Sequence, residues 1–268
     1  MLVAAAVCPC PPLLVPEVAA GAAPELDTAR AACTDALGVL AAARPDLLVV
    51  VGPADTAGPE TYPQGTPGSF HGFGVGLDVR LGADVRPGAD VRPGADVPPE
   101  AGVRPGSEVP HGADRGTPAG PALPYGLAVG AWLLGRTGWA DAPVEGRGVG
   151  EHLTAERCAE EGRAVAARAD RVALLVMGDA SACRTLKAPG YLDERAAPFD
   201  AEIARALGAA DTGALLGLDT GLARDLRVSG RAPWQVLAGA AAGNASLAGA
   251  LLYEDAPYGV GYLVATWS

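Results

Sequence analysis

The sequence predicts an α/β fold with a mostly parallel central sheet flanked by helices. Short apolar runs rich in β-branched residues, bounded by Pro, Gly or charged residues, are typical of buried parallel strands. These runs alternate with longer segments in which apolar residues recur at helical spacing. Hydrophobic residues make up 49% of the 268 residues and charged residues 19%, as in a globular protein. We predict a single domain over residues 1–268, with one insertion at about 80–120.

The first fifty residues predict a strand–helix–strand unit. Residues 1–7 are continuously apolar, and the prolines that follow end the run, which indicates a buried strand. Residues 47–51, with the sequence LLVVV, predict a central parallel strand. Residues 24–43 lie between the two and predict a helix, because their apolar side chains recur at helical spacing: Leu26, Ala29, Cys33, Leu37 and Leu40. Together the three elements form a βαβ unit.

The insertion is a Gly- and Pro-rich repeat. Its sequence repeats GADVRP with a period of six, and each copy contains Gly and Pro. A hexapeptide period is typical of a β-helix, but three copies are too few to bury a core. We therefore interpret the segment as a low-complexity surface insertion without a site of its own.

Regular elements resume after the insertion. A buried strand is predicted over residues 171–179, and two strands around a turn at 254–258 close the chain. Five helical segments are predicted from apolar spacing and helix-start residues, over residues 124–135, 150–169, 198–211, 211–224 and 233–243.

Composition excludes several classes of protein. A net charge of −11 and a pI near 4.7 argue against a nucleic-acid partner and against an anionic membrane surface. No basic region precedes the apolar start, so a signal peptide is not expected, and no apolar run is long enough to span a membrane. Five irregularly spaced cysteines suit reduced thiols in the cytoplasm, and the C-x-C of Cys8 and Cys10 is not the C-x-x-C of zinc or redox sites.

Ligands of open α/β sheets bind outside the carboxyl ends of the strands. Cys10, residues 53–55 and residues 179–182 each follow a predicted strand, so we expect them to converge on a site. Within MGDASA, Asp179 and Ser181 are candidate catalytic residues, because Gly-Asp at a strand end often directs a carboxylate into a cleft. The alternative for Asp179 is to cap the following turn.

Three histidines are present, and none has another His four residues away, so no helical metal motif exists. His71 is a candidate catalytic residue, because the loop SFHGFGVG combines flexible glycines with two aromatic residues. His152 follows Glu151 near a helix start, and His111 lies in the insertion. For each His a solvated or capping role is the alternative. Glu254, in the acidic pair at the last turn, is a candidate carboxylate for a metal or substrate, or a solvated turn residue.

Taken in order, these segments resemble the catalytic chain of class III extradiol ring-cleavage dioxygenases, whose superfamily includes the MEMO-type proteins. CPCPPLLVPE at 8–17 resembles the H-P-P-L-L-x-P-E signature of that family, and RPDLLVVVGPAD at 44–55 resembles its second strand. MGDASACRTLKAPGYLDERAAPFDAEI at 177–203 resembles the G-D-L-S-H stretch and the loop after it. The C-terminal segments GRAPWQVLAGAA and PYGVGYLVATW complete a resemblance that covers nearly the whole chain outside the insertion, and actinobacterial members are most similar.

The resemblance implies a sheet sandwiched between helices, often in a homo-oligomer. It also implies a non-haem Fe(II) held by two His and one Glu, with a further His as acid–base catalyst on a catecholic substrate. The sequence departs from that pattern at each His. Cys10 and Asp55 stand at the two His ligand positions, Ala182 stands at the acid–base position, and the carboxylate ligand corresponds to Glu254. A Cys–Asp–Glu set would invite zinc or copper in place of iron, or hold no metal.

Two functions follow from the resemblance. One is an oxidoreductase on a phenolic small molecule with a rearranged metal site of Cys10, Asp55 and Glu254, and with His71 or His152 as the acid–base group. The other is a relative without catalytic activity that uses the fold and its cleft to bind a small molecule or a protein. A third hypothesis is thiol chemistry at Cys10, which requires a lowered pKa.

Overall fold

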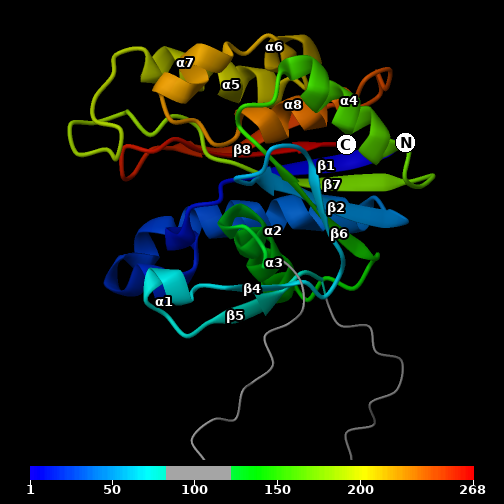
Figure 1. Ribbon diagram of the computed structural model, residues 1–268, viewed down its shortest axis with the longest axis horizontal. Helices are drawn as coiled ribbons and strands as arrows, with labels where there is room; N and C mark the ends of the chain where they lie inside the picture. Colours follow the sequence, from blue (N-terminus) through cyan, green and yellow to red (C-terminus); the bar gives the residue numbers. More distant parts are fainter. Residues whose placement is uncertain (83–121) are drawn as a thin grey trace, which may run out of the picture.

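The computed structural model describes residues 1–82 and 122–268 of the chain (Figure 1). The predicted repeat insertion, apart from its first residues, lies outside the described residues, and so does His111.

The centre of the molecule is a mixed β-sheet, seven-stranded in the described part of the chain, with the order β3-β6-β2-β7-β1-β9-β8. Strands β6, β2, β7 and β1 run parallel to one another, β3 and β9 pair antiparallel at either side of them, and β8 pairs antiparallel with β9. This topology confirms the predicted α/β class with a mostly parallel sheet. The strands are β1 (Leu2–Cys8), β2 (Leu47–Pro53), β3 (Glu60–Tyr62), β6 (Val144–Val149), β7 (Val172–Met177), β8 (Gly249–Asp255) and β9 (Tyr262–Trp267), and a separate hairpin holds β4 (Pro67–Ser69) and β5 (Asp78–Arg80).

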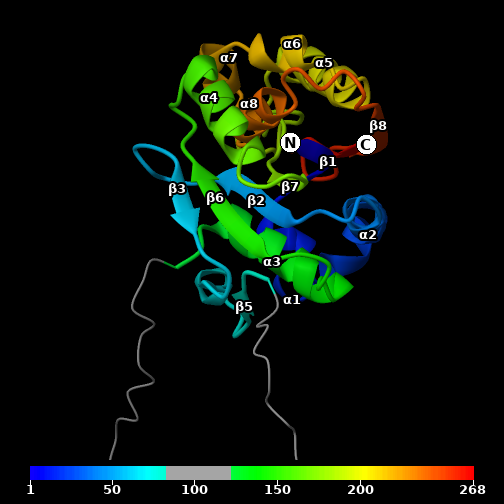
Figure 2. The same cartoon turned by 90° about the vertical axis from the view of Figure 1, so that its right-hand side faces the viewer.

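Helices cover both faces of the sheet, as Figures 1 and 2 show. One face carries α2 (Asp27–Ala42) and α3 (Tyr125–Thr137), and α1 (Pro16–Ala19) lies at the same side. The other face carries α4 (Ala155–Ala166), α5 (Ala196–Gly208), α6 (Thr212–Leu216), α7 (Thr220–Asp225) and α8 (Arg231–Ala240). Short 3₁₀ turns complete the regular structure: η1 (Pro12–Leu14), η2 (Ala20–Leu26) and η3 (His71–Phe73).

The continuous apolar runs in the sequence follow from this layering. In β2, Val49 and Val51 pack in the core under α4–α8, whereas Leu48 and Val50 pack in the core against α2 and α3. Because both faces of each central strand are buried, neither set of alternating residues is polar. Cys8, at the end of β1, belongs to the core on the α2 side.

Strand β6 is not predicted from the sequence, because VEGRGV contains two glycines and two charged residues. Both glycines are required by close packing: a Cβ atom on Gly146 would lie 3.0 Å from the Cβ of Tyr62, and one on Gly148 would lie 2.8 Å from the Cβ of Ala54. Neighbouring segments therefore cross β6 too closely for larger side chains.

The predicted helix over residues 211–224 is interrupted and forms two short helices. Asp211 caps α6 by accepting a hydrogen bond from the backbone N–H of Ala214 (3.0 Å), and Asp219 caps α7 by accepting one from Leu222 (2.7 Å). Two Asp caps in one apolar segment mark two helix starts. The break matters for the site described below, because α7 carries Thr220 and Arg224, which line the cavity there.

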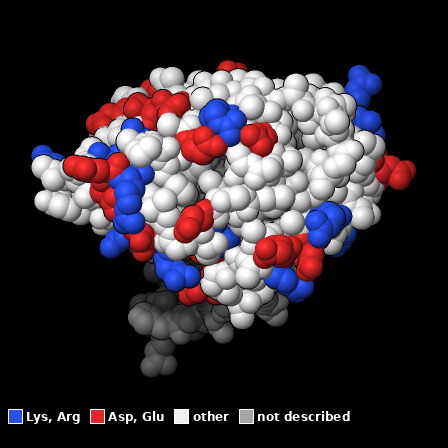
Figure 3. Space-filling view, turned by 90° about the horizontal axis from the view of Figure 1, so that it is seen from above, with Lys and Arg blue, Asp and Glu red and all other residues white. Residues whose placement is uncertain are grey.

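No helix in the two described ranges is long and apolar enough to cross a membrane. Figure 3 looks onto the layer of α4–α8, where basic side chains lie beside acidic ones and do not gather into a continuous basic patch.

Candidate functional site

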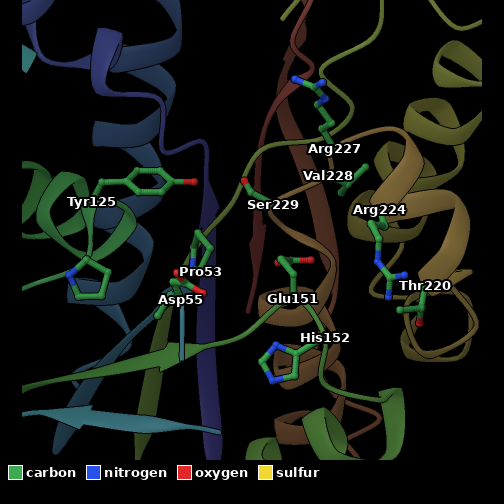
Figure 4. Close-up of a pocket in the computed structure, with 12 residues that line it drawn as sticks. Pro53, Asp55, Tyr125, Glu151, His152, Thr220, Arg224, Arg227, Val228 and Ser229 are labelled. Atoms are coloured by element: carbon green, nitrogen blue, oxygen red, sulfur yellow. The ribbon is translucent and has the colours of Figure 1, made fainter. Parts of the chain in front are cut away.

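A cavity of about 650 Å³ opens at the carboxyl ends of the parallel strands (Figure 4). Its walls are predominantly apolar, with a few charged and hydroxyl-bearing side chains, as is usual for small-molecule sites. The lining residues come from five segments of the chain: Pro53, Ala54, Asp55, Pro124, Tyr125, Glu151, His152, Thr220, Arg224, Arg227, Val228 and Ser229.

Strand ends and helix ends place these side chains. Asp55 follows β2, Glu151 and His152 follow β6, and Tyr125 is the first residue of α3. Arg224 comes from α7, and the loop between α7 and α8 supplies Arg227, Val228 and Ser229. The cavity thus lies where crossover connections leave the sheet on opposite faces, α3 on one and α4 on the other, which is the usual ligand position in open α/β sheets.

Cys10, Asp179 and Ser229 form a hydrogen-bonded group beside the cavity. The backbone N–H of Cys10 donates to Oδ1 of Asp179 (2.8 Å), and the backbone N–H of Asp179 donates to Oγ of Ser229 (3.0 Å). A Cβ atom on Gly178 would collide with the backbone of Gly230, and one on Gly230 would collide with the ring of Trp234, so both positions need glycine for the Ser229 loop to approach the end of β7. Burial raises the pKa of Asp179 to about 7, against the lowering effect of the Cys10 N–H.

Cys10 itself is fully buried, and burial together with the nearby Asp179 raises the pKa of its thiol well above the usual value. A raised pKa is the opposite of what a nucleophilic thiol requires, so the environment of Cys10 does not favour the hypothesis of thiol chemistry there. Cys8 has a different environment: its thiol hydrogen-bonds to Cys33 of α2, which also raises its pKa. Both residues of the C-x-C pair are therefore buried thiols, one in the core and one next to the cavity.

Glu151 is a carboxyl group in the cavity wall whose Oε2 lies 3.8 Å from Nε of Arg231. Its pKa is raised to about 8 by burial, although Arg231 acts in the opposite direction. Arg231 is fully buried and donates to the backbone oxygens of Glu151 and Leu153 and to Oε1 of Gln235 (2.8 Å for each of the last two). It thereby fixes the chain at Glu151, whose Oε1 has no hydrogen-bond partner among the described residues. At neutral pH this carboxyl can donate a hydrogen bond to a ligand.

The predicted metal ligands do not form a metal site. Cys10 lies beside the cavity and Asp55 lines it, but Glu254 lies exposed on the edge strand β8 and is not part of the cavity wall. Among the described residues, no three His, Cys, Asp or Glu side chains are grouped so that they could hold a metal ion. The set of Cys10, Asp55 and Glu254 fits neither Fe(II), which in such oxygenases is held by two His and a carboxylate, nor zinc or copper.

Two of the predicted catalytic residues have other roles. His71 lies in η3 with 59% of its side chain exposed, 3.4 Å from Asp78, and does not line the cavity. Ser181 is fully buried: its Oγ donates to Oδ2 of Asp200 (2.8 Å), and its backbone N–H donates to Oδ1 (2.9 Å). Ser181 therefore has a structural function and no access to a ligand.

His152, the alternative acid–base residue, does line the cavity, with Nε2 3.2 Å from the carbonyl oxygen of Ala57. Sequence reasoning missed Glu151, Tyr125, Arg224 and Ser229. Ligands bind outside the carboxyl ends of the strands, and this rule (the strand-end rule) would also indicate Glu151 if VEGRGV were recognised as a strand. The other three residues come from helix ends and a loop, for which that rule gives no signal.

No family model matches the chain, and no curated protein matches it. Among solved structures, the chain is similar to the crystal structure of an uncharacterized protein from Escherichia coli K12, with a TM-score of 0.52 and 15% sequence identity. The match covers 99% of this chain and 99% of that chain. At this level of identity the likeness supports the α/β fold and carries no conclusion about activity.

Proposed function

We propose that this protein binds a small organic molecule in the cavity at the carboxyl edge of the sheet, without a metal ion. The observation that carries the proposal is the cavity itself: about 650 Å³, with Pro53, Pro124, Tyr125 and Val228 among its walls. Such a volume accommodates a drug-sized molecule. As part of the same proposal, this chain is a relative of the extradiol dioxygenases that retains the cleft but lacks the metal ligands.

The sequence leaves two functions open, ligand binding and ring cleavage. The side chains of the cavity wall that could serve as metal ligands favour binding. Ring cleavage by this family needs nitrogen ligands, and His152 is the only imidazole in the cavity wall within the described residues. The place of the acid–base His is taken by Ala182, which has no titratable group. We also propose a cytoplasmic location, because the five cysteines are all free thiols.

Ligand-observed NMR with a library of aromatic small molecules tests the proposal. Tyr125 is the aromatic group at the cavity mouth, 42% exposed, so Tyr125→Ala removes ligand contact without opening the core. We expect hits whose affinity falls about tenfold in Tyr125→Ala, the order of one lost aromatic contact. The matched control is Tyr191→Ala, which removes a 63% exposed tyrosine outside the cavity and should leave affinity unchanged.

Elemental mass spectrometry of protein purified without chelators or a metal-affinity tag tests the metal-free part. We expect no stoichiometric metal in the wild type or in Cys10→Ala. Near-stoichiometric iron, zinc or copper that disappears in Cys10→Ala would overturn this part and restore the oxidoreductase hypothesis.

A further inference from the structure

Arg224 is an unpaired cation in the wall of the cavity. It lies in the last turn of α7, and its guanidinium makes no ion pair or hydrogen bond with any described residue. Its neighbour Asp225 pairs instead with Arg195 at 3.4 Å. Figure 4 shows the Arg224 side chain extending along the cavity wall toward Thr220. Arg224 is exposed to solvent, and a guanidinium without a protein partner has its five donors available to a ligand.

The other charged groups around the cavity lie apart from Arg224. Arg227 also lines the cavity, with Nη1 donating to the carbonyl oxygen of Pro189 (3.0 Å), a bond that leaves the positive charge uncompensated. On the opposite wall, Asp55 carries the one opposing charge (Figure 4). Oε2 of Glu151 lies 3.8 Å from Nε of the buried Arg231, so any charge on Glu151 is already paired, and burial raises its pKa to about 8. In Figure 4 the guanidinium of Arg227 points away from Glu151 and His152, which leaves Arg224 and Asp55 as the charged groups on opposite walls. This arrangement favours a ligand whose single negative charge lies at the Arg224 end.

The apolar and charged parts of the wall are separated in space. Figure 4 shows Tyr125 and Pro53 on one side of the cavity, and Arg224 and Thr220 across from them. Ser229 and Glu151 lie between the two sides and offer a hydroxyl and a protonated carboxyl. A ligand that spans the cavity would therefore have an apolar or aromatic body at one end and an anionic group at the other.

We propose that the ligand is an organic monocarboxylate whose carboxylate binds the guanidinium of Arg224 and whose apolar body packs against Tyr125. This inference rests on the proposed function, because it specifies the ligand class of the same cavity. A carboxylate matches the planar fork of Arg through two parallel hydrogen bonds. Arg224 would thus determine specificity, while Tyr125 supplies most of the contact area.

The test compares matched acid–amide pairs: benzoate, phenylacetate and 3-phenylpropionate against their primary amides, by ligand-observed NMR at pH 7 with the full chain. The amide has nearly the same shape as the acid but no charge. We expect the wild type to bind at least one acid about tenfold or more tightly than its amide, the range of a charge-assisted hydrogen bond. Arg224→Gln should abolish this preference, and Arg224→Lys should retain part of it.

The control is Arg157→Gln, which makes the same change of charge at a residue 67% exposed on α4 and paired with Glu160. It should keep the preference for the acid. Equal binding of acid and amide by the wild type would overturn the carboxylate inference and leave the proposed function standing. Binding of neither series, nor of any other compound of the aromatic library, would overturn both. A preference that survives Arg224→Gln would overturn the assignment of the anion to Arg224.

Discussion

At the scale of single residues, the site contains two carboxyl groups whose pKa is raised by burial. Asp179 and Glu151 have pKa values raised to about 7 and about 8, and burial is the main cause for each. Groups shifted this far by burial gather at functional sites more often than elsewhere. They also make stability depend on pH in a way that can be measured without knowing the ligand.

We expect the free energy of unfolding to fall as pH rises from about 4 to about 8. The unfolded chain releases these two protons near pH 4, whereas the folded protein keeps them to about 7 and about 8. The folded state therefore holds more protons in this window, so the stabilisation is complete below pH 4 and is lost as pH passes the folded pKa values. Each group contributes a slope of at most about 1.4 kcal/mol per pH unit.

Urea denaturation across this range measures the slope. Asp179→Asn should flatten the profile up to pH 7 and Glu151→Gln up to pH 8. Glu156→Gln is the control, because the pKa of this exposed carboxyl is lowered and its effect lies below the window. A slope that both Asp179→Asn and Glu151→Gln leave unchanged would show that the two carboxyls are ionised in the folded protein.

A second residue-scale prediction separates structural from catalytic roles at Ser181. Asp200 is 1% exposed and accepts hydrogen bonds from Ser181 Oγ, from Ser181 N–H and from Arg184 (3.0 Å). Ser181→Ala leaves this buried carboxylate with one donor fewer, so we expect a loss of about 1–2 kcal/mol in unfolding free energy. Ligand affinity should not change. The exposed Ser69→Ala serves as control for stability, and lost binding in a folded Ser181→Ala protein would contradict the structural role.

At the scale of elements, the approach of α4 to α8 positions the Glu151 side of the cavity. Glycines make this approach possible: a Cβ atom on Gly162 would lie 2.6 Å from the backbone N of Ala240, and one on Gly239 would lie 2.5 Å from the Cα of Ala159. Because α8 begins with Arg231, which holds Glu151, a shift of this helix pair is transmitted to the site.

Gly162→Ala should therefore destabilise the protein by about 1–3 kcal/mol, as expected for overpacking between backbones, and should also weaken ligand binding. The matched control is Gly38→Ala in α2, where an added Cβ meets no atom within 4 Å. In that helix interior the same substitution should stabilise by up to about 1 kcal/mol. Thermal and urea unfolding of both variants measure the two changes in unfolding free energy. Equal changes in Gly162→Ala and Gly38→Ala would mean that α4 and α8 can move apart without loss of stability.

The packing of the helices and strands also explains which parts of the structure could be predicted from the sequence. Strands β1, β2 and β7 were predictable because burial on both faces leaves a continuous apolar run. Strand β6 was not, because close crossings require glycine at Gly146 and Gly148, and this removes the β-branched signal. The strand-end rule therefore found Asp55 and Asp179 but missed Glu151. Nothing in the local sequence of Arg224 indicates a cavity, since the break between α6 and α7 and the packing of α8 place it there.

At the scale of the whole molecule, two electrostatic effects oppose each other for an anionic ligand. The chain carries a net charge of −11, which repels an approaching anion, whereas Arg224 attracts it at the cavity wall. The two effects differ in range. The Debye length falls from about 30 Å at 10 mM salt to about 8 Å at 150 mM, so salt removes long-range repulsion but leaves a direct contact of about 3–4 Å nearly intact.

We therefore expect carboxylate binding to strengthen as salt rises from 10 to 150 mM. The association rate should increase, on the order of twofold to tenfold, while the dissociation rate, set by the contact with Arg224, stays nearly constant. Stopped-flow or NMR exchange measurements with the best-binding acid give both rates, and its neutral amide is the control whose rates should not respond to salt. In Arg157→Gln the rise should persist, because the global charge is almost unchanged. A carboxylate affinity that falls with salt would mean that the cations of the cavity already dominate the field at its mouth.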